Sequence, residues 1–183
     1  MLKIINNVLE PTDLFTLYEG LIGHHMWNLN RSSDVTVGGR FPGCSFIVNG
    51  KTNYNDQYWI GYFRCLLERI NQKLKEQHNF SVPIKVDSLS LNAQNDNHYT
   101  EFHTDKANRY SIVGFLTPQW AEDWGGELNI EGKIIKYKPG DFVLFDSELL
   151  HRSQEIKKLP YWRITVAYVI EKFEIGTRQI SKI

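Results

Sequence analysis

The sequence predicts a mainly β fold in which a helical N-terminal part supports a sandwich or barrel of short strands. Two observations carry this prediction. Apolar residues recur at helical spacing before residue 80, and short apolar stretches separated by Gly and Pro turns follow Pro83. With 183 residues, 42% of them hydrophobic, the chain fits one domain with a proper core. We expect helical support over residues 1–82 and the β core over residues 83–171.

Two helices are predicted before the β core. The first covers residues 11–22 and opens on a Pro-Thr pair that suits a helix start. The second covers about residues 57–76, with one apolar and one charged face, which is typical of a helix packed on a sheet. Between them, residues 31–56 are rich in Gly, Ser and Asn. They are either a mobile lid loop or an edge hairpin at 45–48 with flexible flanks.

Seven strands are predicted after Pro83. The first alternates polar and apolar residues, as a strand with one buried face does. Turns at Gly132 and at Pro139-Gly140 separate later ones. Short strands joined in this way are typical of an all-β sandwich or barrel. The predicted strands cover residues 85–91, 110–116, 127–130, 134–137, 141–145, 150–153 and 162–170.

The charge balance and the cysteine content limit the partners and the compartment. The 21 basic residues balance the 21 acidic ones, so no general field attracts nucleic acid or an anionic membrane. Cys44 and Cys65 lack CxxC spacing, which favours reduced thiols over a disulfide or a zinc site. The sequence shows no signal peptide and no apolar stretch of membrane-spanning length. We expect a soluble cytoplasmic protein whose oligomeric state stays open.

The candidate metal ligands are His103, Asp105 and His151. The first two lie two residues apart at a strand or strand end, so both side chains point to one side and can meet one ion. His151 follows a turn, a buried strand and a polar loop, which places it on a strand pairing back toward His103. Two imidazoles and a carboxylate can occupy one face of octahedral Fe(II) and leave three positions open. The alternatives are a His–Asp hydrogen bond at a loop edge and an ordinary buried histidine.

The candidate anchor for an acidic cosubstrate is Arg163, twelve residues beyond His151 in an apolar predicted strand. An unpaired buried charge is very costly, so this guanidinium needs an anionic partner, and its fork of donors matches a carboxylate. Thr165 lies on the same face of the strand and can donate a further hydrogen bond. The alternative is an internal ion pair with Glu127 or Asp146.

Taken together, these residues resemble the Fe(II)/2-oxoglutarate-dependent oxygenases, specifically their prolyl-4-hydroxylase-like branch. The resemblance covers about residues 87–170 and rests on the order HxD, GGE-L, G-D-x-x-x-F-D, H and R-x-T. It implies a double-stranded β-helix, a jelly roll with a cupin-like core, and N-terminal helices packed on one side. It also implies that His103, Asp105 and His151 bind the iron, and that Arg163 binds the distal carboxylate of 2-oxoglutarate.

The sequence departs from this branch just before the first metal ligand. The hydroxylases often carry a Tyr nine residues before that histidine and a Gly six residues before it, where this chain has Gln94 and Asn97. Relatives with Asn-x-Gln on this strand suggest that Asn92 and Gln94 contact 2-oxoglutarate instead. The departure leaves the substrate open between a peptide and a small molecule, with a peptidyl prolyl residue as the first candidate.

The resemblance implies a dioxygenase that hydroxylates an unactivated C–H bond and releases succinate and CO2. Its cofactors would be Fe(II), 2-oxoglutarate as cosubstrate and O2, with ascorbate as a reductant. Two other classes compete with it. A cupin-like metal-binding protein or isomerase usually uses more His ligands and needs no buried Arg, and a catalytically degenerate binding module would lose iron affinity. The complete ligand set and Arg163 favour the oxygenase.

Overall fold

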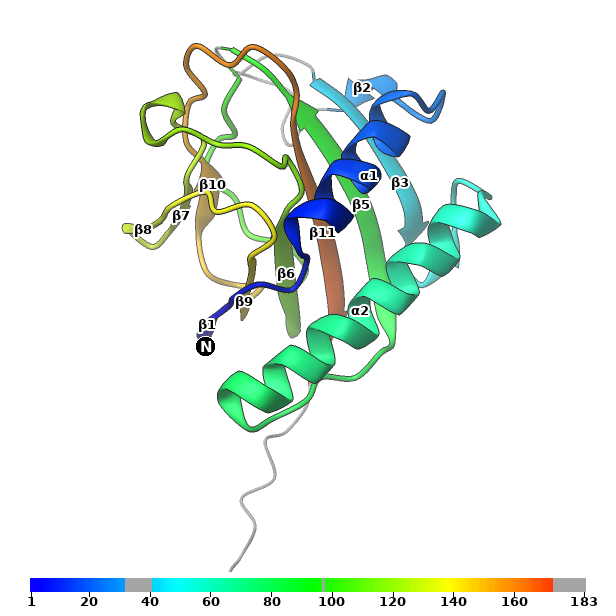
Figure 1. Cartoon of the computed structure of the whole chain (residues 1–183). Coiled ribbons are helices and arrows are strands. Elements are labelled where there is room, and N and C mark those ends of the chain that lie inside the picture. The colour runs from blue at the N-terminus through cyan, green and yellow to red at the C-terminus, as the bar shows by residue number, and fades with distance from the viewer. Residues whose placement is uncertain (32–40, 97, 173–183) are drawn as a thin grey trace, which may run out of the picture.

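The computed structural model describes residues 1–31, 41–96 and 98–172, in which eleven strands form two sheets and two α-helices cover one of them. Figure 1 shows the helices α1 and α2 together over one face of the larger sheet, with the smaller sheet on the other side. The predicted mainly β fold with helices packed on one side is confirmed.

The larger sheet has eight antiparallel strands, and most strands that pair in it are not consecutive in the sequence. Its order is β1-β9-β6-β11-β5-β3-β2, and the short strand β4 pairs with β3. The bounds are β1 Leu2–Ile5, β2 Asn28–Arg31, β3 Phe41–Val48, β4 Lys51–Thr52, β5 Val86–Gln94, β6 Arg109–Phe115, β9 Phe142–Asp146 and β11 Arg163–Glu171.

The smaller sheet has the order β10-β7-β8, with β7 at Leu128–Ile130, β8 at Lys133–Ile135 and β10 at His151–Ser153. It packs on the larger sheet through a buried cluster that joins Leu128 and Ile130 to Phe115 and Phe145. The face of the larger sheet that looks toward the smaller one is called the inner face below.

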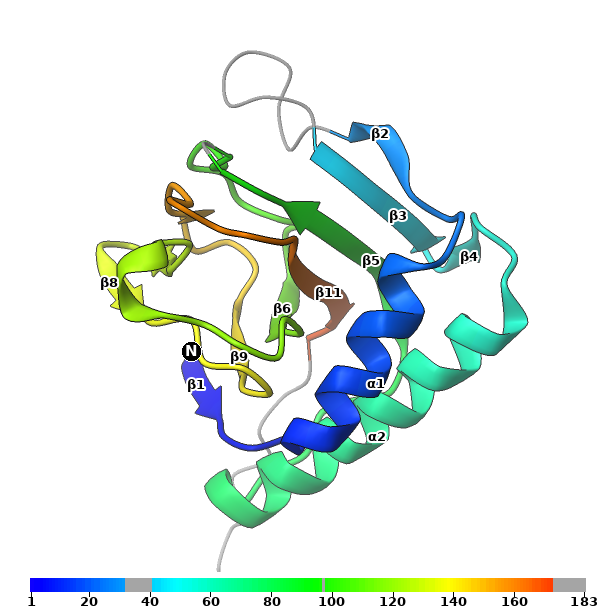
Figure 2. The same ribbon diagram turned by 45° about the horizontal axis from the view of Figure 1, so that its top comes forward.

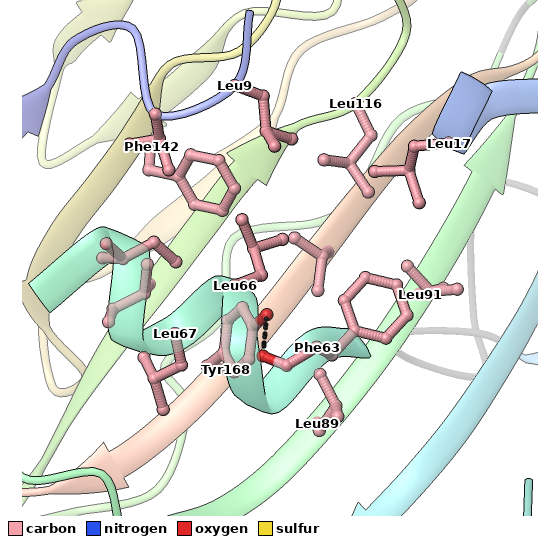
Figure 3. Close-up of a cluster of buried hydrophobic side chains, with 14 of the residues drawn as sticks. Leu9, Leu17, Phe63, Leu66, Leu67, Leu89, Leu91, Leu116, Phe142 and Tyr168 are labelled. Atoms are coloured by element: carbon pink, nitrogen blue, oxygen red, sulfur yellow. Dashed lines mark hydrogen bonds between the residues drawn. The ribbon is translucent and has the colours of Figure 1, made fainter. Parts of the chain in front are cut away.

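The opposite face of the larger sheet forms the main core with α1 (Pro11–Ile22) and α2 (Gln57–His78). Proline at the first turn suits the start of α1, and Asp56 caps α2 through the backbone N–H of Trp59. Figure 3 shows Phe63 of α2 among leucines of β5, where its carbonyl accepts a 2.9 Å hydrogen bond from Tyr168 of β11. None of the helices in the described part of the chain is long and apolar enough to cross a membrane.

The predicted elements after Pro83 are confirmed in kind. The strands β5 to β11 each overlap one predicted strand, and their ends differ by at most three residues. Helix α1 occupies the predicted residues 11–22, and α2 continues two residues beyond the predicted end at residue 76.

The expectation of an essentially helical N-terminal part was wrong in two places. Residues 2–5 form β1, which pairs with β9. Part of the expected lid loop is a strand, since β3 covers residues 41–48 and lies between β5 and β2 (Figure 2). The expected hairpin at 45–48 does form, because the end of β3 pairs with β4, but β3 does not lie at the edge of the sheet. Pro42 and Gly43 made this segment look like a loop, but pairing with β5 satisfies its backbone. Residues 32–40 of the expected lid lie outside the described residues.

Candidate active site

The fold brings His103, Asp105 and His151 together although 46 positions separate the last two in the sequence. One donor atom from each residue lies within 4.8 Å of the others, and Nε2 of His151 is 3.6 Å from Oδ2 of Asp105. His103 and His151 face each other in an antiparallel bridge, with backbone hydrogen bonds of 3.0 and 2.9 Å. The predicted pairing of the His151 strand back toward His103 is confirmed.

Hydrogen bonds to the backbone orient both imidazole rings. Nδ1 of His103 lies 2.8 Å from the carbonyl oxygen of Glu101, and Nδ1 of His151 lies 2.9 Å from that of Leu149. Because a carbonyl only accepts, each Nδ1 carries the proton, and each Nε2 keeps a free lone pair. Backbone acceptors that set the tautomer in this way are a usual second layer around metal-binding histidines.

Burial favours the neutral form of His151. Its side chain is 5% exposed and contacts the ring of Phe145 on the inner face. Desolvation lowers the pKa of this imidazole, while the hydrogen bond to Leu149 and the nearby Asp105 act in the opposite direction. A neutral imidazole is the form that binds a metal. Two such nitrogens and a carboxylate form a donor set that fits Fe(II).

Asp105 lies in a loop, and two serines that the sequence analysis missed hold it. The hydroxyl of Ser111 on β6 donates a hydrogen bond to Oδ2 of Asp105. The hydroxyls of Ser111 and Ser147 lie 2.8 Å apart. The backbone N–H of Asp105 donates to the carbonyl of Ser147 at 2.9 Å. No motif marks these serines, because their role follows only from the packing of β6 and β9 beside the loop.

Arg163 is buried on the inner face of β11 at 2% exposure, and no carboxylate among the described residues forms an ion pair with it. Its guanidinium donates to Oε1 of Gln94 at 2.6 Å and to the carbonyl oxygen of Gly126 at 2.9 Å. Asp146 pairs with Lys172 instead, at 2.6 Å. The alternative of an internal ion pair with Glu127 or Asp146 is therefore wrong.

Burial makes this arginine electrostatically costly. Desolvation lowers the pKa of Arg163 to about 10, against small opposing effects of Tyr137 and Glu127. The ring of Tyr137 lies 5.1 Å from the guanidinium carbon, and Trp120 stacks on that ring. Aromatic faces attract a cation only weakly compared with a carboxylate, so the site still favours an anion.

Two buried donor nitrogens, one of the guanidinium itself and one beside it, have no partner within the described part of the chain. They are Nε of Arg163 and Nε2 of Gln94, and these two residues face each other across β11 and β5. Thr165 is buried two residues further on and is in register with Asn92. The four predicted cosubstrate residues therefore form two adjacent cross-strand pairs on the inner face.

Gly126 explains why the GGE segment lies beside the arginine. Its φ is +71°, and a Cβ atom there would come within 3.1 Å of Nε of Arg163 and of the Trp120 ring. The missing side chain lets its carbonyl oxygen approach the guanidinium. Gly125 also has a φ of +71°, so both glycines adopt a conformation that other residues rarely take just before β7. Trp120 and Trp124 pack edge to face against each other beside these glycines.

Three of the other histidines have partners away from this cluster. His24 lies 3.3 Å from the carboxylate of Asp56, and Nε2 of His78 lies 2.7 Å from the carbonyl oxygen of Ile4. Nδ1 of His98 accepts a hydrogen bond from the backbone N–H of Asn95. Among the residues that the structure describes, the only His, Cys, Asp or Glu cluster suited to a metal is the one at His103.

Residues 89–170 match the model of the 2OG-Fe(II) oxygenase superfamily. The match covers the strands β5 to β11, apart from the ends of β5 and β11, and includes all three candidate metal ligands and Arg163. No protein in the curated collection of sequences matches this chain.

Solved structures share the fold at low sequence identity. An oxidoreductase of the 2OG-Fe(II) oxygenase family from Burkholderia pseudomallei has a TM-score of 0.71 and 12% identity, over 92% of this chain and 84% of the other. A prolyl-4-hydroxylase from Pseudomonas putida has a TM-score of 0.65 and 14% identity, over 94% and 93%. The α-ketoglutarate-dependent epimerase SnoN from nogalamycin biosynthesis also reaches 0.65, with 12% identity over 93% and 78%. The predicted double-stranded β-helix is thereby confirmed.

Proposed function

We propose that this chain is a 2-oxoglutarate-dependent Fe(II) oxygenase that hydroxylates an unactivated C–H bond. The match of residues 89–170 to the 2OG-Fe(II) oxygenase superfamily supports this proposal. The proposed iron ligands are Nε2 of His103, Nε2 of His151 and the carboxylate of Asp105. Their tautomers, mutual distances and donor types support this assignment. When bound, Fe(II) with 2-oxoglutarate and O2 supplies the oxidising power for the reaction, with succinate and CO2 as coproducts.

The observation that carries the cosubstrate assignment is a fully buried guanidinium that has no acidic partner among the residues the structure describes. Arg163 is surrounded by neutral acceptors and an aromatic ring, so an unpaired charge lies inside the protein. Nε of Arg163 and Nε2 of Gln94 also lack hydrogen-bond partners within residues 1–31, 41–96 and 98–172. A carboxylate from outside the chain satisfies both needs, since it brings a negative charge and several lone pairs. We assign this place to the distal carboxylate of 2-oxoglutarate.

Thr165 and Asn92 complete the proposed cosubstrate pocket. Both lie one inward-facing position from the Arg163–Gln94 pair, on the same two strands. Polar groups at that spacing can bind the chain of the cosubstrate between the arginine and the metal ligands. The roles of the protein are to orient the cosubstrate and to exclude water, for which rigid strands are well suited.

The proposed primary substrate is a peptidyl prolyl residue. The Pseudomonas putida prolyl-4-hydroxylase shares the fold over nearly the whole of both chains, which supports this choice. A small molecule is the alternative, because the epimerase SnoN, an enzyme with a different reaction, has the same TM-score.

We also propose that the protein is cytoplasmic, on the ground of its thiols. Cys44 and Cys65 are both free cysteines, the first buried and the second exposed.

Anaerobic titration of the apoprotein with Fe(II) and 2-oxoglutarate tests the cofactor assignment. We expect a visible charge-transfer band that His103→Ala abolishes and His25→Ala, at an exposed histidine, retains. Arg163→Ala should weaken 2-oxoglutarate binding about 30-fold or more, since losing a partner of a buried charge costs about 2 kcal/mol or more. The control Arg69→Ala removes a partly exposed arginine of α2 that pairs with Asp13, and it should leave binding unchanged. A folded wild-type protein without the band would rule out the assignment.

The substrate proposal needs a separate measurement. The Fe(II)-loaded protein, with 2-oxoglutarate, O2 and ascorbate, is incubated with proline-containing peptides, and the peptides are examined by mass spectrometry for an added oxygen atom. Succinate is measured in parallel. Peptide-dependent succinate with hydroxylated proline supports the proposal. Succinate formation that no peptide stimulates would contradict prolyl hydroxylation and leave the cofactor assignment intact.

A further inference from the structure

The carboxylate of Asp105 is held by a chain of two buried hydroxyls that the proposed reaction does not by itself require. Ser111 is 1% exposed and Ser147 is fully buried, in surroundings that include the apolar Phe145, the register partner of Ser111. A buried hydroxyl costs free energy unless it is hydrogen-bonded. Alanine would be the less demanding residue at both positions if only packing mattered.

The direction of this chain follows from counting protons. An ionised carboxylate only accepts, so the single hydroxyl proton of Ser111 points to Asp105. The 2.8 Å contact between the two serines must then use the proton of Ser147, with the oxygen of Ser111 as acceptor. The bonds therefore run from Ser147 to Ser111 to Asp105. Successive hydrogen bonds in one direction polarise and strengthen one another.

Backbone hydrogen bonds of Asp105 and Ser147 also hold the metal loop in place. The N–H of Asp105 donates to the carbonyl of Ser147, and the N–H of Ser147 donates to the carbonyl of Arg109 at the start of β6. The loop that carries Asp105 is thus joined to β6 and to the end of β9. Its carboxylate is restrained in both position and rotation, whereas the two histidines receive their orientation from backbone carbonyls.

We propose that Ser111, supported by Ser147, is a positioning residue that holds the carboxylate of Asp105 in the orientation needed to bind the metal. This inference rests on the proposed metal site. Partners behind metal ligands typically contribute 10- to 100-fold to metal affinity. Ser111→Ala should therefore weaken metal binding by about tenfold or more. Ser147→Ala should weaken it less, since Ser111 can still donate to Asp105.

The test is titration of the apoprotein with Co(II) alone, followed by its visible d–d bands, for wild type and four variants. Asp105→Ala is the reference for a lost ligand, beside Ser111→Ala and Ser147→Ala. Ser90→Ala is the matched control, because Ser90 lies on β5 opposite Ala167 and β11 separates it from β6. Thermal unfolding of each metal-free variant reports any purely structural loss.

We expect the affinity for Co(II) to be highest in the control Ser90→Ala, lower in Ser147→Ala and lower still in Ser111→Ala. The Co(II) bands of Ser111→Ala should also differ from those of the wild type. Lower stability of metal-free Ser111→Ala with wild-type affinity and wild-type bands would reduce the serine to a structural role and overturn the proposal. If Ser111→Ala does not fold, equal affinities of Ser147→Ala and Ser90→Ala overturn it. Wild-type protein that binds no Co(II) would rule out the metal site itself. Co(II) affinity that falls only in Asp105→Ala and stays at the wild-type value in Ser111→Ala and Ser147→Ala would rule out this inference alone.

Discussion

The side-chain oxygen of Gln94 accepts a 2.6 Å hydrogen bond from the guanidinium of Arg163, its register partner on the neighbouring strand. The acceptor is neutral, although the donor is a buried cation. The amide thus orients the arginine without neutralising it, and the amide nitrogen stays available to the same ligand. A site built in this way is ready for an anion and costs free energy while the anion is absent.

Gln94→Glu should convert the open anion site into an internal ion pair. The substitution keeps the shape of the side chain but places a carboxylate against Arg163. We expect the free energy of unfolding without 2-oxoglutarate to rise, because the buried charge gains a partner. The dissociation constant of 2-oxoglutarate should rise at least about tenfold, which corresponds to about 1.4 kcal/mol. Urea unfolding and the charge-transfer titration measure the two effects. Gln119→Glu, at an exposed position, is the control, and unchanged cosubstrate affinity in Gln94→Glu would contradict the assigned pocket.

Gly126→Ala should weaken 2-oxoglutarate binding in addition to destabilising the fold. The new Cβ atom would lie 3.1 Å from Nε of Arg163, so the guanidinium must shift away from its present place. A non-Gly residue at positive φ costs of the order of 1 kcal/mol in stability. We expect cosubstrate affinity to fall several-fold beyond anything that this strain explains.

Gly132→Ala separates these two effects. Gly132 also has a positive φ, +83°, but nothing lies within 4 Å of the Cβ position. Thermal unfolding should show a loss of stability in both variants, whereas the cosubstrate titration should change only in Gly126→Ala. Equal affinities in the two would show that Arg163 tolerates the added methyl group.

Tyr137→Phe should destabilise the protein and spare cosubstrate binding. The buried hydroxyl of Tyr137 donates to the carbonyl of Ile164 at 3.0 Å and accepts from the N–H of Thr117 at 2.9 Å. Its loss leaves the buried N–H of Thr117 unpaired, whereas the carbonyl of Ile164 keeps its hydrogen bond from the N–H of Leu116, so the expected cost is about 1–3 kcal/mol. The aromatic ring under Arg163 remains. Urea unfolding and 2-oxoglutarate titration check both statements, with Tyr58→Phe, 71% exposed, as the control. Strong loss of affinity would assign the hydroxyl to the pocket.

The protein should lose stability as the pH rises above 10. Desolvation raises the pKa of Tyr18 from 10.0 to about 12, and burial also raises the pKa of Tyr137, Tyr161 and Tyr168. Above pH 10 the unfolded chain releases phenol protons that the folded chain keeps. The free energy of unfolding is thus unaffected by these groups below pH 10 and falls from there toward pH 12. Tyr18→Phe should make the decline shallower between about pH 10 and pH 12 in urea unfolding. An unchanged slope would contradict the role of Tyr18.

Local sequence patterns were sufficient to predict the helices and strands whose apolar residues recur at a regular spacing. The apolar periodicity of residues 57–76 and the short strands after Pro83 need only the 3.6- and 2-residue repeats, which neighbouring residues impose on any packed helix or strand. Local patterns were insufficient to predict β1 and β3. These two strands are defined by partners, β9 and β5, that follow much later in the chain, and local periodicity does not specify such pairings.

The order of His103, Asp105, His151 and Arg163 in the sequence was sufficient to name the candidate chemistry, because those residue types have few other joint uses. Only the tertiary structure decided which partners they have. Strand register placed Gln94 beside Arg163 and kept every carboxylate among the described residues out of ion-pair distance. The packing of β6 beside the metal loop brought Ser111 to Asp105. The sequence determines which donor atoms are present, whereas the distances between side chains on different strands depend on the register and packing of the whole sheet.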